Sequence, residues 1–122
     1  MLPEGHDPAH VWDILQAAKN VLEFTRGKTY EDYAQDEMLQ AAVERKVEII
    51  GEAAQRVSRA FQAAHPEIPW RQIAAQRNVI IHEYDRLDSA RMWKLVTQHL
   101  PRLVEQLAPL IPEPPPDPEP GP

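Results

Sequence analysis

The sequence predicts an all-α fold, an antiparallel bundle of four to five helices. Apolar residues recur at three- and four-residue steps along most of the chain, which is the spacing of one helix face. No stretch shows a convincing alternation of apolar and polar residues, so strands are not expected. With 122 residues and 43% hydrophobic composition, the chain is long enough for one core and too short for two. We therefore expect one helical domain over residues 1–108 and a separate tail over residues 109–122.

The first expected helix runs from Val11 to Phe24. Gly27 follows it and is a natural stop signal. Asp7 and Pro8 precede it, as an expected N-cap and an expected first-turn proline. The apolar positions of this helix are Val11, Ile14, Leu15, Ala18, Val21, Leu22 and Phe24.

A second, long helix is expected from Thr29 to about Ala64. Thr29 and Asp32 match a capping pattern at its start. Gly51 costs about 1 kcal/mol relative to alanine inside a helix, so it predicts a close crossing with a neighbouring helix. The apolar stripe expected to face the core consists of Val43, Val47, Ile50, Ala54, Val57 and Phe61.

Prolines delimit the remaining helices. Pro66, in the turn HPEIP, ends the long helix, and Pro69 suits the first turn of the next one. Asp88 and Ser89 start a last helix, which is expected to kink at Pro101. The apolar stripe of this last helix consists of Trp93, Val96, Leu100, Leu103 and Leu107.

The composition indicates a soluble protein with a polar tail. The tail reads PLIPEPPPDPEPGP and is expected to be disordered or extended, outside the fold. The chain has no cysteine, which is compatible with a reducing compartment. Its N-terminal residues do not resemble a signal peptide, and no apolar run reaches the roughly 20 residues of a membrane span. We therefore expect a cytoplasmic protein without membrane contact.

The charge is unevenly distributed along the chain. A net charge of −6 argues against nucleic-acid binding through a generally basic surface. Residues 56–102 nevertheless carry eight basic and four acidic side chains. Their basic side chains form a candidate anion-binding face, although scattered arginines are also common in surface ion pairs. The candidates are Arg56, Arg59, Arg71, Arg77, Arg86, Arg91, Lys94 and Arg102.

Residues 76–86, QRNVIIHEYDR, bring an arginine, a histidine and a tyrosine close together in the chain. Histidine can donate or accept a proton at neutral pH, and arginine presents a planar charged fork to phosphate oxygens. Cleavage of RNA by its own 2′-hydroxyl benefits from a base, an acid and fixed positive charge at the phosphate, and it requires no metal. The same residues would also suit an ordinary helix surface on which the arginine pairs with an acid.

The spacing of Arg77 and His82 restricts how they can act together. They are five residues apart, so along a regular helix their directions diverge by ~140°. A single unbroken helix therefore cannot aim both side chains at one atom. Either the helix loosens near His82, or two copies of the motif form one site across a two-fold axis, with two histidines and two arginines.

Three segments of the chain resemble one known family. They are IIGEAA at residues 49–54, IPW at 68–70 and RNVIIHEY at 77–84, and their order and spacing agree with that family. The chain resembles the HepT-like family of the HEPN superfamily, whose motif is R-x-x-x-x-H-x-Y. The resemblance implies a homodimeric, metal-independent endoribonuclease toxin that uses no cofactor. It also implies a partner, a small nucleotidyltransferase antitoxin of the MntA type that adds AMP to the toxin.

The resemblance assigns roles to individual residues. Arg77 would bind the phosphate and stabilise the transition state, and His82 would transfer protons. Asn78 would orient the histidine or the phosphate. Tyr84 would be the tyrosine that the partner modifies with AMP. Glu52, within IIGEAA, is a further candidate for buried polar support, with helix packing or a surface position as the alternatives.

Two alternatives stay open at this point. The superfamily includes non-catalytic members, so the chain would instead be a binding module that recruits or regulates a nucleotidyltransferase. The acidic Glu83 and Asp85 beside the motif are poorly suited to attracting RNA. His6 and His10 are four residues apart and would hold a metal if helical, but they lack a clear third ligand, so no metal site is predicted.

Overall fold

Helices dominate the described part of the chain. The computed structural model describes residues 6–75 and 89–111, and no strand occurs within those ranges. The elements are α1 (Asp7–Phe24), α2 (Tyr30–Gln35), α3 (Glu37–Arg56), α4 (Arg59–Ala64), α6 (Ser89–Lys94), a π-helical segment (Leu95–His99), α7 (Leu100–Leu107) and a 3-10 turn (Ala108–Leu110). Residues 70–75 are also helical. The predicted all-α class is confirmed.

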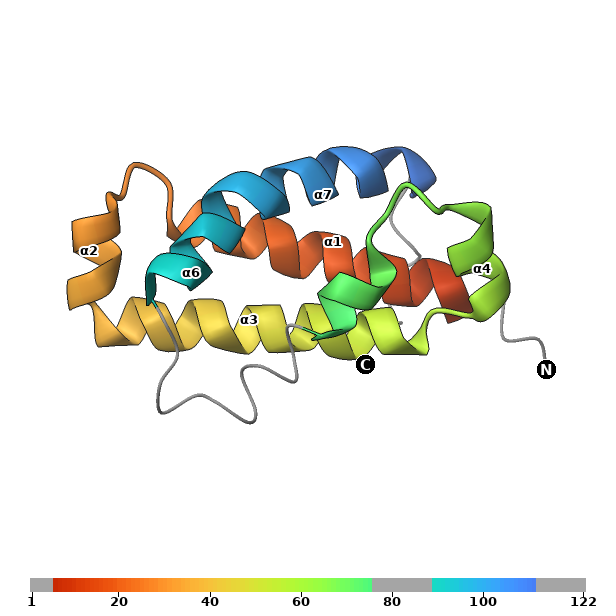
Figure 1. Cartoon of the computed structure of the whole chain (residues 1–122), viewed down its shortest axis with the longest axis horizontal. Helices are drawn as coiled ribbons and strands as arrows, with labels where there is room; N and C mark the ends of the chain where they lie inside the picture. Colours follow the sequence, from red (N-terminus) through yellow and green to blue (C-terminus); the bar gives the residue numbers. More distant parts are fainter. Residues whose placement is uncertain (1–5, 76–88, 112–122) are drawn as a thin grey trace, which may run out of the picture.

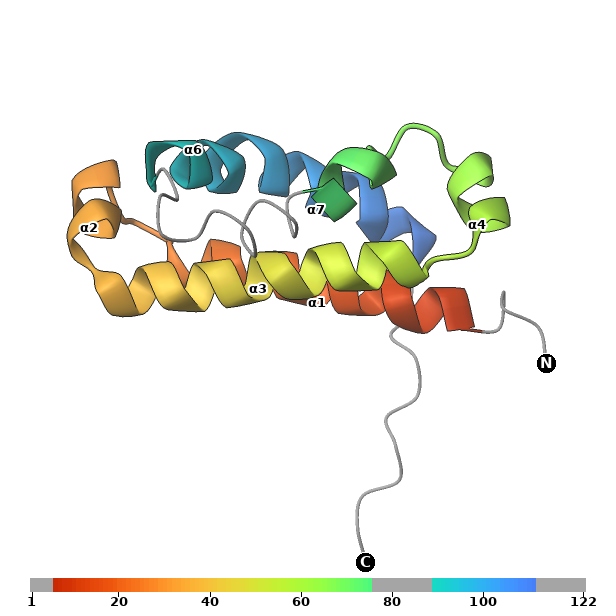
Figure 2. The same cartoon turned by 60° about the horizontal axis from the view of Figure 1, so that its bottom comes forward.

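The long elements pack as an antiparallel bundle. Figure 1 shows α1 running opposite to both α3 and α7, with the short helices α2 and α4 at the two ends of the bundle. In the turned view of Figure 2, α1 and α3 lie side by side and the stretch from α6 to α7 packs over them. The core lies between these layers, where Ile14, Val47 and Leu103 are at most 5% exposed.

Helix α1 begins one turn before its predicted apolar pattern. Asp7 is its first residue, and His6 occupies the N-cap without a side-chain hydrogen bond. The predicted capping role of Asp7 is therefore wrong, whereas Pro8 lies in the first turn as expected. Beyond Phe24, Gly27 has a left-handed φ of 72°, which confirms it as the residue that lets the chain leave the helix.

The single helix predicted over residues 29–64 is wrong, because the structure divides it into α2, α3 and α4. Asp36 is extended, and its carboxylate accepts a hydrogen bond from Leu39 N–H at 2.9 Å at the start of α3. Ser58 is also extended, and its hydroxyl accepts from Phe61 N–H at 3.1 Å at the start of α4. Short polar side chains that bond the backbone locally favour such breaks over a continuous helix.

The predicted cap and stripe within that region are correct. Asp32 N–H donates to Thr29 Oγ1 at 3.1 Å, and Thr29 N–H donates to Asp32 Oδ2 at 2.9 Å. The bond from Thr29 N–H lowers the pKa of the Asp32 carboxyl, because it favours the charged form. The stripe residues Val43, Val47, Ile50, Ala54 and Val57 are buried, and Phe61 packs against the core while partly exposed.

Asp7 and Ser58 join the start of α1 to the start of α4. Asp7 is 1% exposed. Its carboxylate accepts hydrogen bonds from Ser58 N–H at 2.8 Å and from Ser58 Oγ at 2.6 Å. Because the Ser58 oxygen also accepts from Phe61 N–H, one polar network holds α1 against the break between α3 and α4.

Asp7→Ala is expected to lower the free energy of unfolding by about 2–4 kcal/mol, since it leaves the two Ser58 donors without their acceptor. Asp13→Ala, at an exposed position of the same helix, should change it by less than about 0.5 kcal/mol. Urea denaturation followed by circular dichroism measures both values. Equal effects of the two substitutions would contradict the anchoring role of Asp7.

The last helix is irregular just before Pro101. Leu100 N–H donates to Leu95 O, a bond to the fifth residue back, so the turn Leu95–His99 is π-helical. Pro101 has no N–H, and its ring crowds the carbonyl of the fourth residue back, which a wider turn relieves. The buried stripe of this stretch starts at Met92, which is 3% exposed, rather than at the half-buried Trp93.

Part of the predicted tail contacts the bundle. The 3-10 turn Ala108–Leu110 continues α7, and Leu110 and Ile111 pack against the core while partly exposed. The rest of the tail lies outside the described residues. No helix within the described ranges has both the length and the apolar character of a membrane span.

Candidate functional site

The motif predicted to carry the chemistry lies outside the described residues. This holds for Arg77, Asn78, His82 and Tyr84, whose arrangement therefore stays a prediction. The structure does describe the segments that lead into the motif and out of it. Both flanks contact the bundle through residues that the structure describes.

The IPW segment holds the incoming flank. Ile68 and Trp70 are 2% and 7% exposed. The Trp70 indole N–H donates to His65 O at 3.0 Å, and the Trp70 ring meets the Phe61 ring edge-on with centroids 6.1 Å apart. As predicted, the chain turns after α4 and becomes helical again just after Pro69. The helix leading to the motif therefore leaves a turn that is packed onto the core.

Helix α6 holds the outgoing flank. Ser89, its first residue, shares a hydrogen bond of 3.1 Å with the Tyr30 hydroxyl on α2. The Trp93 ring packs against the Tyr33 ring with centroids 5.3 Å apart. Both contacts join α6 to α2, at the end of the bundle opposite α4 (Figure 1).

Tyr33 is a buried support rather than a reactive group. It is 0% exposed, and its hydroxyl has no hydrogen-bond partner in the ranges that the structure describes. Burial raises the pKa of Tyr33, and the nearby Glu44 carboxylate raises it further, so the hydroxyl stays protonated at neutral pH. Burial also raises the pKa of Glu44. Tyr33 thus supplies an apolar face for Trp93.

Glu52 belongs to the IIGEAA segment of α3. It is half-buried between Gly51 and Ala53, which are both buried. The residues it was predicted to support lie outside the described part of the chain. Its role as a polar support therefore stays a prediction. Gly51 is buried on α3, and the close helix crossing predicted there stays a prediction as well.

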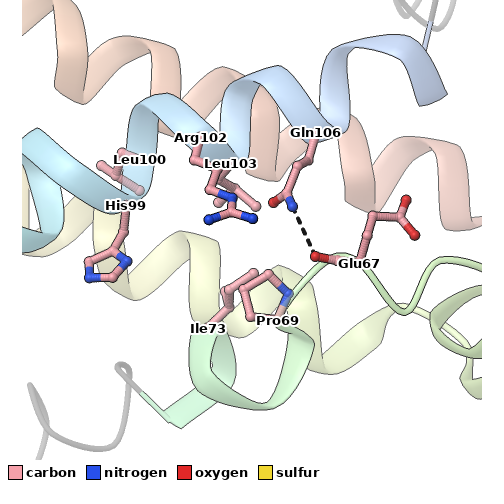
Figure 3. A pocket seen from close by; sticks show the side chains of 8 residues that line it. All are labelled: Glu67, Pro69, Ile73, His99, Leu100, Arg102, Leu103 and Gln106. Atoms are coloured by element: carbon pink, nitrogen blue, oxygen red, sulfur yellow. Dashed lines mark hydrogen bonds between the residues drawn. The ribbon is translucent and has the colours of Figure 1, made fainter.

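A hollow of about 250 Å³ lies between the incoming flank and the last helix, and we call it the α7 hollow (Figure 3). Its lining includes Pro69, Ile73, His99, Leu100, Arg102 and Leu103. The isoleucine and the two leucines are buried and form an apolar wall. The histidine and the arginine are exposed and form a polar edge.

The edge of the α7 hollow carries positive charge. Figure 3 shows the Arg102 guanidinium extending into the hollow, whereas the Glu67 carboxylate is turned away from it. Glu67 Oε2 instead lies 3.4 Å from His65 Nδ1, and Glu67 O accepts a hydrogen bond from the Gln106 amide at 2.9 Å. Within the described ranges, 6–75 and 89–111, no carboxylate forms an ion pair with Arg102.

A second, more open hollow adjoins the first at Pro69. Arg59 and Arg71 line it, and no carboxylate is among its described lining residues. Both arginines are exposed. Three members of the predicted anion-binding face, Arg59, Arg71 and Arg102, therefore gather around one turn.

His99 was not singled out from the sequence, yet it lies at the edge of the α7 hollow. It ends the π-helical segment, and such insertions occur frequently at functional sites. Pro101, two residues later, is the sequence signal that points to this irregularity. His6 and His10 have ring centroids 6.4 Å apart, and the described residues contain no group of three potential metal ligands.

Comparison with known families shows to which family the chain belongs. A sequence model of the family described as "Ribonuclease HepT-like" matches residues 14–110, a range that contains the motif, both flanks and the α7 hollow. The chain belongs to the HepT-like family. The family proposed from the sequence segments is thereby confirmed.

Relatives of this HepT-like chain carry names that refer to ribonuclease activity. "Putative RNase MJ1380" of Methanocaldococcus jannaschii is 34% identical, over 81% of this chain and 91% of the relative. "Probable ribonuclease HepT" of Thermococcus cleftensis is 43% identical, over 75% of this chain and 83% of the relative. "Putative RNase TTE0752" of Caldanaerobacter subterraneus subsp. tengcongensis is 33% identical, over 80% of this chain and 88% of the relative. No solved structure shows a significant match to the chain.

Proposed function

We propose that this HepT-like protein is a metal-independent endoribonuclease, the toxin of a cytoplasmic toxin–antitoxin pair. The observation that carries the proposal is the complete R-x-x-x-x-H-x-Y motif, from Arg77 to Tyr84, within a chain of this family. The names of the relatives support RNA as the substrate. The anchored flanks on both sides of the motif are consistent with a site that must hold its groups in place.

The proposed reaction is an internal transesterification. The 2′-oxygen of a ribose attacks the adjacent phosphorus while a base removes its proton, and the bond from phosphorus to the 5′-oxygen breaks as an acid protonates that oxygen. His82 would transfer protons, and Arg77 would stabilise the negative charge on the phosphate oxygens. Asn78 would orient the histidine or the phosphate. The products are a 2′,3′-cyclic phosphate and a 5′-hydroxyl.

A homodimer would complete this site. Arg77 and His82 diverge by ~140° along a regular helix, so two motifs that face each other across a two-fold axis would supply the base, the acid and the charge together. Glu52 would support this composite site from α3, where it is half-buried.

A partner nucleotidyltransferase of the MntA type would neutralise the toxin. The proposed target is the hydroxyl of Tyr84, two residues after His82. AMP on this oxygen would add a bulky group and negative charge next to the place of the RNA phosphate. Substrate would then be excluded by steric overlap and by repulsion between like charges.

The purified protein is expected to sediment as a dimer at micromolar concentration and to cleave single-stranded RNA in the presence of EDTA. Analytical ultracentrifugation gives the mass in solution, and mass spectrometry of the fragments identifies the cyclic phosphate ends. Cleavage that EDTA abolishes and magnesium restores would exclude the metal-independent mechanism. A fully active monomer would exclude the composite site, and binding to the nucleotidyltransferase without cleavage would favour a non-catalytic module.

A further inference from the structure

We infer that the α7 hollow is an RNA subsite that takes one unpaired base of the substrate beside the cleavage site. The inference rests on the proposed ribonuclease function and deepens it, because it names a binding position outside the catalytic motif. It uses only the described residues around Pro69, the π-helical segment and α7.

The form of the hollow fits one base better than a larger ligand. Its volume of about 250 Å³ is slightly below the usual range of small-molecule sites, about 300–1,000 Å³. Ile73, Leu100 and Leu103 provide an apolar wall that would exclude water from the face of a base. Proteins that read single-stranded RNA stack its unstacked bases on histidine, on other aromatic rings or on the plane of an arginine. His99 and Arg102 place one of each such group at the same edge.

The charge around the hollow also fits a nucleic acid strand. Arg102 reaches the hollow, and the Glu67 carboxylate is turned away from it (Figure 3). Arg59 and Arg71 line the adjoining hollow on the other side of Pro69. A strand whose base enters the α7 hollow would therefore bring its neighbouring phosphates close to further arginines. These arginines form a local basic group on a protein whose net charge is −6.

The position of the hollow along the chain connects it to the proposed catalytic residues. Ile73, in its apolar wall, is four residues before Arg77 in the sequence. The helix that carries Ile73 starts from the fixed IPW turn. A base held there would therefore orient the strand relative to the motif that follows.

The first test measures binding of a short single-stranded RNA with 2′-O-methyl groups at every position, which lacks the attacking hydroxyl. Arg102→Gln should weaken binding about ten-fold by fluorescence anisotropy, through loss of a charged hydrogen bond. It should also reduce the slope of log affinity against log salt by about 0.7, the value for one phosphate of a single strand. Arg26→Gln removes the same charge in the α1–α2 connection, at the other end of the bundle, and should change neither quantity.

The second test locates the base. In methyl-labelled protein, the signals of Ile73, Leu100 and Leu103 should shift when the same RNA is added, whereas those of Ile14 in the α1 core should not. Unchanged methyl signals, or equal effects of Arg102→Gln and Arg26→Gln, would overturn the inference. Shifts caused only by a partner nucleotidyltransferase would overturn it as well and would make the hollow a protein contact.

These outcomes separate the subsite from the proposed function. A protein that binds the RNA with the expected methyl shifts but does not cleave natural RNA would refute the ribonuclease and retain the subsite. A protein that cleaves RNA while its methyl signals stay unchanged would refute the subsite alone.

Discussion

His82→Ala is expected to slow RNA cleavage by about 10²- to 10⁴-fold, the usual contribution of general acid or base catalysis. Alanine cannot take the proton from the 2′-hydroxyl or give one to the leaving 5′-oxygen. In the proposed dimer the substitution removes both histidines at once, so neither proton transfer is retained. Single-turnover cleavage of an end-labelled RNA measures the rate of the chemical step.

His6→Ala is the matched control for this substitution. His6 is exposed at the N-cap of α1 and makes no side-chain capping bond, so its loss should leave the rate unchanged. Arg77→Lys should also impair cleavage, because a point charge does not replace a planar fork. Full activity of His82→Ala in a folded protein would eliminate the proposed proton-transfer role.

Tyr84→Phe should escape neutralisation by the partner nucleotidyltransferase while retaining cleavage. The substitution removes the oxygen proposed to receive AMP and nearly preserves the ring. The modified parent would carry added negative charge where an RNA phosphate must sit, which opposes binding of the substrate. Intact mass after incubation with the partner, ATP and magnesium reports the modification, and RNA cleavage in the same sample reports neutralisation.

Tyr30→Phe provides the comparison for this experiment. Tyr30 is 37% exposed, and its hydroxyl shares a hydrogen bond with Ser89 Oγ, so it is an alternative tyrosine on the surface. We expect Tyr30→Phe to be modified and neutralised like the parent. AMP on Tyr84→Phe at the level of the parent would place the modification elsewhere, and an unmodified parent would indicate neutralisation by binding alone.

The apolar pattern was sufficient to predict the helices that build the core. Val11, Ile14 and Val21 on α1, and Val43 and Val47 on α3, are all buried as their spacing predicts. Such positions can be read from a sequence because the helix period alone places them on one face. The cap formed by Thr29 and Asp32 was predictable for a similar reason, since both partners lie within one turn of chain.

The ends of the helices were less predictable. The apolar stripe continues from α3 towards α4, so it gives no sign of the break at Ser58. That break is stabilised by Asp7, which is 51 residues away in the sequence. The polar side chain of Asp7 looked like a local N-cap, whereas the packing of α1 against α3 gives it a distant partner.

The sequence by itself determined the helical class, the family and the identity of the residues proposed for catalysis, because these depend on residue type and short spacing. Only the tertiary structure decided how the last helix widens before Pro101 and which side chains surround the α7 hollow. His99 and Arg102 are more than 20 residues from Pro69 and Ile73 in the chain, and they lie around one hollow because α7 packs across the IPW turn. A pocket of this kind depends on the packing of distant segments, which neither helix periodicity nor a local motif encodes.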